Sequence, residues 1–247
     1  MNQDDWIIPD WPAPANVKAL ITTRSGGVSL GPYASMNPAG HVGDDTQAVL
    51  RNRALLRAHL PQEPHWLQQV HGTQVLQVTL DARDALEADA AVTDIPNQVC
   101  AVLTADCLPV LFCAEDGSAV AVAHAGWRGL AAGVLERAVQ AMALPGARVL
   151  AYLGPAIGPR AFEVGAEVRA AFMAVESQAA QAFQAIEGSD KYLADLYLLA
   201  RQRLAHAGVV RVYGGDFCTY SEPERFFSYR RDGATGRMAA LMWLAGV

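Results

Sequence analysis

Short apolar segments separated by turn residues recur through the first half of the chain and predict β-strands. Three of them are nearly continuous runs of Val, Leu, Phe, Ala and Cys, which is typical of strands buried on both faces. The predicted strands lie at 17–23, 66–70, 73–78, 99–103, 108–113 and 119–123. Turn residues such as His71-Gly72 and Glu115-Asp116-Gly117-Ser118 separate neighbouring runs.

A first helix is predicted after the sequence Asp44-Asp45-Thr46, whose side chains can cap the first turn. We expect it to extend to about His59, where Pro61 and Pro64 stop it. Its apolar side is expected to consist of Val49, Leu50, Leu55 and Leu56.

A second helix is predicted from Leu130, Val134, Ala138 and Met142, which recur every four residues before Pro145-Gly146 ends the pattern. Two further helices are predicted around Val168, Phe172 and Val175 and around Leu196, Leu199 and Leu204, with Gly208 closing the last.

The end of the chain has the pattern of a β-hairpin, with arms at 225–231 and 237–244 and a turn near Asp232-Gly233. Strand pairs joined by turns and mixed with helices predict an α+β fold with partly antiparallel sheets. No linker-like segment divides the sequence, so we expect one domain over residues 1–247.

Composition narrows the possible functions. The 25 acidic and 19 basic side chains give a formal charge of −6, which argues against a general nucleic-acid or membrane-surface binder. No apolar run approaches the roughly 18 residues of a membrane span, and the acidic N-terminus does not resemble a signal peptide. We therefore expect a cytoplasmic protein whose four cysteines are reduced.

The Asp116-Gly117 turn predicts the register of a hairpin and, with it, a metal site. A turn centred there pairs residue i with residue 233 − i, so that His124 faces Pro109 and Cys107 faces Gly126. Cys107 and His124 are then diagonal neighbours on one face, roughly 7–8 Å apart at Cα. Thiolate and imidazole together are a good ligand pair for zinc or copper.

The third ligand of this site stays open at the level of residue pattern. His71, at a strand end before Gly72, is the first choice, and His41, which follows Gly40, is the second. The alternative is that Cys107 and His124 are packed core residues, which is the commoner role of such residues in apolar strands.

Three segments of the chain have a more specific pattern. They are Trp66-Leu67-Gln68-Gln69-Val70-His71-Gly72, Thr104-Ala105-Asp106-Cys107-Leu108-Pro109-Val110 and His124-Ala125-Gly126-Trp127-Arg128-Gly129-Leu130. They resemble the signature segments of the YfiH-type laccase-domain family, also called the purine nucleoside phosphorylase, polyphenol oxidase or multicopper oxidase-like family. The resemblance covers nearly the whole chain and extends to Leu153-Gly154-Pro155 and Phe227-Ser228-Tyr229-Arg230-Arg231.

This resemblance implies a metal, usually zinc, held by His71, Cys107 and His124. It also implies mixed β-sheets sandwiched between helices in a single domain. The implied activities are phosphorolysis of adenosine, inosine and methylthioadenosine, together with adenosine deamination. Three protein ligands leave a fourth zinc position open, which is typical of catalytic zinc. The expected partners are purine nucleoside and phosphate substrates, and we expect a monomer.

The remaining site residues are predicted from chemistry. Asp106 and Glu163 are candidates for the acid or base of deamination, with a structural turn or cap as the alternative for each. The phosphate needs cationic or amide donors. The candidates are Arg24 with the Ser25-Gly26-Gly27 loop, Arg128 at a helix start, and Arg230, Arg231 and Arg237 in the last hairpin. Trp127 is expected either to stack on a purine or, more commonly, to pack its helix against the sheet.

Two other enzyme classes remain open. A copper-dependent, laccase-like polyphenol oxidase would use the same ligands, but six histidines in the chain are too few for an additional trinuclear copper cluster. A Cys-His amidase acting on cell-wall precursor peptides would use Cys107 as nucleophile and His124 as base. A non-catalytic metal-binding protein is the third alternative, and it predicts a closed site with four protein ligands.

Overall fold

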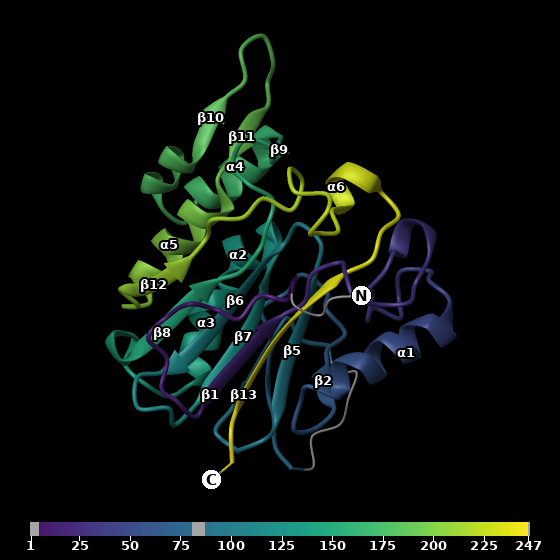
Figure 1. Ribbon diagram of the computed structural model, residues 1–247. Coiled ribbons are helices and arrows are strands. Elements are labelled where there is room, and N and C mark those ends of the chain that lie inside the picture. The colour runs from purple at the N-terminus through teal and green to yellow at the C-terminus, as the bar shows by residue number, and fades with distance from the viewer. Residues whose placement is uncertain (1–4, 81–86, 247) are drawn as a thin grey trace.

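Two β-sheets packed face to face form the centre of the computed structural model, which describes residues 5–80 and 87–246 (Figure 1). Residues 1–4, which belong to the N-terminal segment discussed above, lie outside this description. The first sheet has the order β1-β13-β5-β2. Its strands are β1 (Val17–Ile21), β13 (Met238–Leu244), β5 (Val99–Thr104) and β2 (Pro64–Trp66).

The second sheet has six strands in the order β12-β8-β6-β7-β4-β3. Its strands are β12 (Arg211–Gly214), β8 (Val149–Leu153), β6 (Leu108–Ala114), β7 (Val120–Ala125), β4 (Ala90–Thr93) and β3 (Val75–Gln77). The two outermost pairs are parallel and the inner pairs are antiparallel, so the sheet is mixed, as expected from the sequence. A separate three-stranded sheet contains β10 (Phe183–Ala185), β11 (Tyr192–Ala194) and β9 (Glu163–Val164).

Helices lie on the outer faces of the sheet pair (Figure 1). The α-helices are α1 (Thr46–Arg57), α2 (Trp127–Ala132), α3 (Val134–Ala141), α4 (Ala166–Met173), α5 (Leu196–His206) and α6 (Tyr229–Asp232). The 3-10 helices η2 (Gly31–Tyr33), η3 (Gly146–Arg148) and η4 (Ser177–Ala182) lie in the connections. No helix in the described ranges is long and apolar enough to cross a bilayer.

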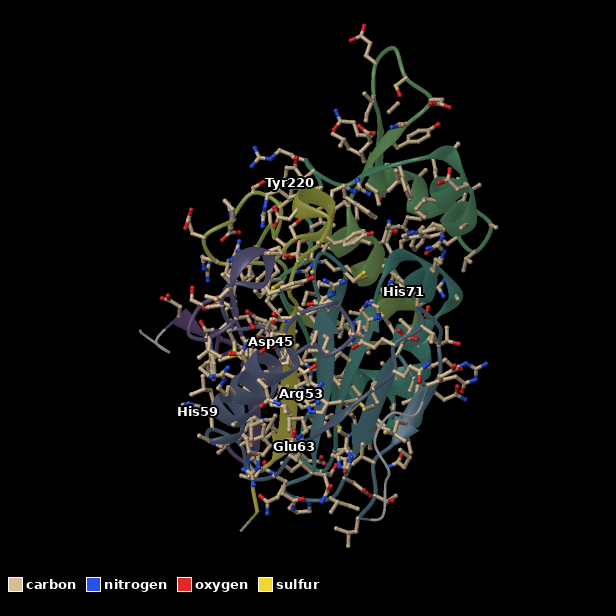
Figure 2. All side chains as sticks on the ribbon, turned by 90° about the vertical axis from the view of Figure 1, so that its right-hand side faces the viewer. Asp45, Arg53, His59, Glu63, His71 and Tyr220 are labelled. Atoms are coloured by element: carbon tan, nitrogen blue, oxygen red, sulfur yellow. The ribbon has the colours of Figure 1, made fainter. Side chains whose placement is uncertain are left out.

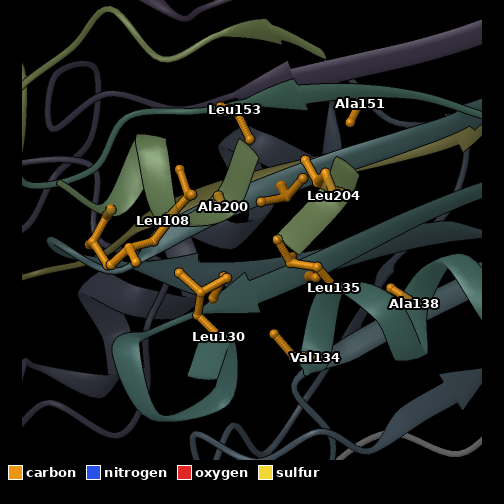
Figure 3. Packing of buried hydrophobic residues seen from close by; sticks show 14 of the residues in the cluster. Leu108, Leu130, Val134, Leu135, Ala138, Ala151, Leu153, Ala200 and Leu204 are labelled. Atoms are coloured by element: carbon orange, nitrogen blue, oxygen red, sulfur yellow. The ribbon is translucent and has the colours of Figure 1, made fainter. Parts of the chain in front are cut away.

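Alternating side chains divide the buried residues into three layers. Between the two sheets lie Val102, Leu111, Val122 and Met242 with their neighbours. The opposite face of the six-stranded sheet packs against α2, α3 and α5, and Figure 3 shows part of this cluster, including Leu108, Leu130, Leu135 and Leu204. Leu56 of α1 covers the outer face of the four-stranded sheet. The predicted α+β architecture with helices outside mixed sheets is therefore confirmed.

The predicted hairpin register is confirmed. In the β6–β7 pair Pro109 lies opposite His124, and every paired position follows the predicted rule. The Ala114 N–H donates to the Ala119 carbonyl across the turn, and Gly117 has a φ of 70°, a conformation that glycine adopts without strain.

Two helix predictions need correction. The helix expected over Leu130–Met142 is two helices, α2 and α3, because Gly133 adopts a left-handed conformation with a φ of 100° between them. All four periodic residues are nevertheless buried. On α1 the N-cap at Asp45 is confirmed, but Leu50 points to solvent and is 52% exposed. Val175, expected on the apolar face of α4, lies beyond the helix and is also exposed.

The predicted C-terminal hairpin is wrong. Its first arm is not a strand, because Ser228 caps the short helix α6 by accepting a hydrogen bond from the Arg231 N–H. Its second arm, β13, pairs with β1 and β5 instead. The apolar run at the end of the chain correctly predicts the strand β13, but the partners of this strand are distant in sequence.

The strand expected at 66–70 lies earlier in the chain, because β2 spans Pro64–Trp66 and shares only Trp66 with the prediction. It ends at Trp66, and Gln69 then extends the edge of β5 with its side chain rather than its backbone. The Gln69 amide donates to the Leu103 carbonyl and accepts from the Leu103 N–H, at 2.9 and 2.7 Å. This pairing fixes the start of the loop that carries His71.

Candidate metal centre

Two connections cross between the packed sheets at one end of the molecule, and each carries a predicted metal ligand. Residues 105–107 lead from β5 in the four-stranded sheet to β6 in the six-stranded sheet, and Cys107 is the last of them. Residues 67–74 lead from β2 to β3 and contain His71, which is labelled in Figure 2. His124 lies near the end of β7, beside both connections.

The three predicted ligands converge. One ligand atom each of His71, Cys107 and His124 lies within 4.8 Å of the other two, and Cys107 Sγ is 3.8 Å from His71 Nε2. The two imidazole rings meet edge to face, with centroids 4.7 Å apart. His124 is buried, Cys107 is half-buried and His71 is exposed, so the cluster opens to solvent on one side. Over residues 5–80 and 87–246 it is the only such group of three or more His, Cys, Asp or Glu side chains.

The geometry fits a tetrahedral metal ion. Zinc bonds of about 2.3 Å to sulfur and about 2.1 Å to nitrogen place two ligand atoms about 3.6 Å apart at a tetrahedral angle. The sulfur–nitrogen distance of 3.8 Å is close to this value. Gly126, opposite Cys107 in the hairpin register, leaves the space, because a Cβ there would lie 2.7 Å from His71 Cδ2 and 3.0 Å from Cys107 Sγ. The donor set and the cavity therefore suit zinc or copper.

A buried carboxylate, Asp89, organises two of the three ligands. It accepts a hydrogen bond from His124 Nδ1 at 2.8 Å, which leaves Nε2 of that ring for a metal. It also accepts from the N–H groups of Val70, His71 and Gly72, at 3.2, 2.9 and 2.6 Å. Asp89 has no exposed surface, so this network is shielded from water. Sequence reasoning missed Asp89, whose one signal is an acidic residue directly before an apolar strand.

Unusual backbone conformations flank the cluster. His71 has a φ of 60° and Asp106, next to Cys107, has a φ of 87°, both in the left-handed region that non-glycine residues rarely adopt. Hydrogen bonds hold both in place: the Asp89 carboxylate holds His71, and the Asp106 carboxylate accepts from the Thr219 hydroxyl and the Arg230 N–H, each at 2.6 Å. Strained residues of this kind concentrate at functional sites.

The local electrostatics favour the thiolate form of Cys107. Burial by itself would raise the pKa of its thiol, but the imidazoles of His124 and His71 outweigh that effect and lower the pKa to about 6. For His124, burial opposes protonation, while Cys107 and Asp89 favour it and raise its pKa overall. Without metal, these two side chains therefore form a thiolate–imidazolium pair near neutral pH. A deprotonated thiol is also the form that binds a metal.

A cavity of about 360 Å³ lies against the three ligands. This volume falls within the range of about 300–1,000 Å³ typical of small-molecule sites. Besides the three ligands, His41, Gln69, Leu103, Thr104, Ala105, Tyr229 and Arg237 line it. His41, the alternative third ligand, thus lies in the same pocket but outside the ligand cluster.

The two predicted acid–base residues have structural partners. The Asp106 carboxylate is bound by Thr219 and Arg230, and its carbonyl accepts from Ile157, so it holds the connection that carries Cys107. Glu163 lies in β9 and forms an ion pair with Lys191 at 2.6 Å. Neither residue lines the metal pocket, and their catalytic role stays a prediction that no contact here supports.

The predicted phosphate ligands Arg24, Ser25 and Arg128 do not line the pocket either. Arg24 donates to the carbonyls of Ala34 and Pro223 and packs over the Phe227 ring. The amides of the Ser25-Gly26-Gly27 loop are partly taken as well, since the Gly27 N–H donates to the Ser35 hydroxyl.

Trp127 and most of the other predicted arginines also lie outside the metal pocket. Arg128 stacks on Trp127, which packs against the core rather than lining the cavity. Arg230 donates to the Glu163 carbonyl, and Arg231 donates to the carbonyls of Thr219, Tyr220 and Phe226. Of the predicted arginines, Arg237 alone lines the metal pocket in the described part of the chain.

Comparison with known proteins agrees with these features. The family model described as "Multi-copper polyphenol oxidoreductase laccase" matches residues 18–245. A relative from Escherichia coli K12, named purine nucleoside phosphorylase YfiH, is 58% identical over 240 residues, which is 96% of this chain and 98% of the relative. A relative from Pseudomonas aeruginosa, named purine nucleoside phosphorylase PA4543, is 54% identical over 97% of this chain and 98% of its own length.

Solved structures have the same fold. The crystal structure of Neisseria meningitidis protein NMB0706 superimposes with a TM-score of 0.94 at 55% identity, covering 98% of this chain and all of the other. YlmD from Geobacillus stearothermophilus gives a TM-score of 0.88 at 32% identity, covering 100% of this chain and 98% of its own. Sequence segments, site geometry and fold agree, and the chain belongs to the YfiH family of laccase-domain proteins.

Proposed function

We propose that this protein is a zinc-dependent purine nucleoside phosphorylase that also deaminates adenosine. The observation that carries the proposal is the convergence of His71, Cys107 and His124 beside a 360 Å³ cavity, where the described residues offer three protein ligand atoms. Zinc bound by three protein ligands retains an open position and supplies Lewis-acid chemistry there. The names of the E. coli and P. aeruginosa relatives support the phosphorylase activity.

Phosphorolysis of a nucleoside needs no oxidant or reductant, because its bonds, electrons and proton balance between phosphate and nucleoside. An oxygen of hydrogen phosphate forms a bond to C1′ of the nucleoside, while the C1′–N9 bond breaks and its electron pair stays with the purine. The proton that hydrogen phosphate loses is the one that the purine gains. The chain must therefore hold an anion close to C1′ and exclude competing water. Adenosine, inosine and methylthioadenosine share the ribosyl–purine bond on which this step acts.

In this proposal Asp89 is a positioning residue. It holds the ring of His124 and the backbone that carries His71, which fixes where both ligands start from. Gly126 keeps the space beside Cys107 and His71 open. Adenosine deamination, in which a water oxygen replaces the amino group at C6 and ammonia leaves, would use the same cavity.

The positions of the other histidines argue against a multicopper laccase. A multicopper laccase needs a trinuclear cluster besides its first copper site. His59 contacts Trp6, His65 pairs with Gln98 and His206 pairs with Glu176. The described residues contain no second group of three metal-binding side chains.

A thiol hydrolase is the second candidate, and one observation favours it. Cys107, His124 and Asp89 form a nucleophile–base–carboxylate series, with His124 Nδ1 2.8 Å from Asp89 and the pKa of Cys107 lowered to about 6 by its imidazole neighbours against the effect of burial. Both functions use the same side chains, so the metal content of the active protein distinguishes them.

The decisive experiment is incubation of the purified protein with adenosine, with and without phosphate, followed by product identification. We expect adenine and ribose 1-phosphate only when phosphate is present, and inosine in both cases. A chelator should abolish both reactions and zinc should restore them. His206→Ala, at a surface ion pair on α5, is the matched histidine control and should retain activity. Full activity of the metal-free protein, or amide hydrolysis that resists chelation, would replace the proposal with the thiol hydrolase.

A further inference from the structure

The cavity beside the metal cluster contains a cationic side chain, Arg237, that is not one of the three metal-binding residues. Arg237 lies directly before β13 and lines this cavity together with His71, Cys107 and His124. Its backbone N–H donates to the Asn37 side chain at 3.0 Å, and its Nη1 donates to the carbonyls of Thr235 and Gly236 at 2.9 and 3.0 Å. These contacts fix one side of the guanidinium in place.

The Arg237 guanidinium packs over the Tyr229 ring, 5.9 Å from the ring centroid, and its Nε and Nη2 atoms remain available to a ligand. Within residues 5–80 and 87–246, no hydrogen bond occupies its Nε or Nη2, and no carboxylate forms an ion pair with it. Asp106, whose charge favours the protonated guanidinium of Arg237, is already bound by the Thr219 hydroxyl and the Arg230 N–H. Burial opposes the charge of Arg237, and Cys107 and Asp106 offset this only through space, so an anion bound directly to the guanidinium would stabilise it.

The surroundings of His41 show that positive charge gathers on this part of the pocket. Burial lowers the pKa of His41, and the guanidinium charges of Arg237 and Arg53 lower it further. His41 therefore stays neutral near pH 7 and offers a ring N–H or lone pair beside the cations. Figure 2 labels Arg53 on α1, whose side chain packs over Trp66 and donates to the Pro38 carbonyl.

We propose that Arg237, assisted by His41, binds the inorganic phosphate co-substrate in the metal pocket. The inference rests on the proposed phosphorylase function and specifies which side chain of this chain holds its anion. A planar guanidinium with free Nε and Nη2 presents two parallel N–H donors, the arrangement that pairs bidentately with two phosphate oxygens. Its place in the same cavity as the metal ligands brings the anion close to the proposed reaction centre.

The assignment moves the phosphate role from Arg24, the first choice of the sequence analysis, to Arg237. The guanidinium of Arg24 donates hydrogen bonds to backbone carbonyls from both Nε and Nη1, whereas that of Arg237 donates from Nη1 alone. The two arginines differ in what remains unpaired and in which of them faces the cavity.

The test compares Arg237→Lys and Arg237→Gln in zinc-loaded full-length protein. Lysine retains the charge but loses the fork, and glutamine loses both. We expect the KM for phosphate to rise about 10-fold or more in Arg237→Lys and further in Arg237→Gln. The KM for adenosine and the zinc content should change less than about 2-fold. Arg51→Lys, on the exposed face of α1, is the control and should behave as the parent protein.

Calorimetric titration with inorganic phosphate, in the absence of nucleoside, gives a readout independent of turnover. The parent protein should bind phosphate, and Arg237→Gln should bind it at least about 10-fold more weakly with an unchanged circular dichroism spectrum. A parallel titration with acetate should show little binding, and equal binding of acetate and phosphate would overturn the assignment to phosphate.

The two proposals fail in different ways. Phosphate binding that depends on Arg237 without detectable phosphorolysis would uphold the anion site and reject the phosphorylase function. Phosphorolysis with an unchanged phosphate KM in both variants would uphold the function and overturn the role of Arg237. His41→Gln should raise the phosphate KM less than either Arg237 variant, and a larger effect at His41 would also contradict the assignment.

Discussion

The two ends of the β6–β7 hairpin have opposite chemistry, although the same two strands form both. At the turn, Arg148 pairs with Glu115 and Asp116 at 2.8 and 2.6 Å, and Arg211 also contacts Glu115. These ion pairs are exposed to solvent, where such pairs contribute little to stability. At the open end, His124 is buried and bonded to the buried Asp89, while Cys107 is half-buried beside the exposed His71. The two ends therefore differ in both their residue types and their exposure to water.

Two cysteines of the same segment show this difference most directly. Cys113 lies in β6 among apolar side chains, and burial raises its pKa to about 12. Cys107 lies six positions earlier, and His124 and His71 lower its pKa to about 6 against the effect of burial. The first thiol is inert and the second is ready to bind a metal. The partners that the fold supplies decide which cysteine is a thiolate near neutral pH.

Removal of a ligand should have the largest effect. Zinc sites with four protein ligands bind with about 10–16 kcal/mol, so loss of one ligand should weaken binding about 100–1,000-fold. Cys107→Ser and His71→Ala should therefore lose bound zinc and adenosine turnover, as measured by elemental analysis and product assay. Cys113→Ala, at the other end of the strand, should keep one zinc per chain. Stoichiometric zinc in Cys107→Ser would refute the assigned site.

Thiol reactivity in the metal-free protein should separate the two cysteines by pH. The lowered pKa means that Cys107 is protonated below about pH 6 and is a thiolate above it, so alkylation by iodoacetamide should rise through a midpoint near pH 6. Cys113 should stay unmodified at neutral pH in the folded protein. Peptide mapping by mass spectrometry over pH 4–10 distinguishes the sites. A Cys107 midpoint near its ordinary value of about 8.5–9 would show that the imidazoles do not stabilise the thiolate.

Substitution of the orienting carboxylate should have a smaller effect than loss of a ligand. Asp89→Asn removes the charge that His124 and three backbone amides share, and we expect zinc affinity to fall about 10–100-fold. Competition titration with a chromogenic chelator measures this loss. Asp116→Asn, at the turn end, is the matched control and should leave the affinity unchanged. Equal affinities in the two variants would reduce Asp89 to a purely structural residue.

Two glycine substitutions should give the smallest and most selective effects. Gly126→Ala brings a Cβ to 2.7 Å from His71 Cδ2, so we expect zinc affinity to fall several-fold with little change in stability. Gly117→Ala forces a side chain onto a residue with a φ of 70° and should lower stability by about 1–2 kcal/mol without altering zinc binding. Chemical denaturation measures the stability of both variants and zinc titration measures their zinc affinity, and each variant should change only one of the two quantities. The same response in both would mean that the hairpin ends are coupled.

The sequence predicts the β6–β7 hairpin correctly because the residues that set its register are adjacent in the chain. An Asp-Gly turn sets the register, and the register alone places Cys107 and His124 on one face. The third ligand could not be chosen this way, since His71 reaches the cluster through a connection between the two sheets. The residue pattern ranks His71 before His41 without deciding between them, and the family resemblance selects His71.

Long-range partners account for what the sequence did not reveal. Asp89 is a single acidic residue with no motif around it, and its role depends on three amides from a distant loop. The sequence does not show which of Arg24 and Arg237 has guanidinium nitrogens available. Only the fold shows that Nε and Nη1 of Arg24 donate to backbone carbonyls. The predicted C-terminal hairpin is wrong for the same reason, because β13 pairs with β1 and β5 and not with residues 225–231.

The insertion of β13 between β1 and β5 has a consequence for synthesis on the ribosome. The facing edges of those two strands are separated in the finished sheet by a segment that is translated more than 200 residues after β1. At about 5–20 residues per second, β1 waits roughly 10–40 s and β5 roughly 7–27 s for their partner. Until then both edges are open to pairing with other nascent chains. Arg237 precedes β13 directly, so an interrupted polypeptide would lack the sheet's central strand and the proposed anion site together.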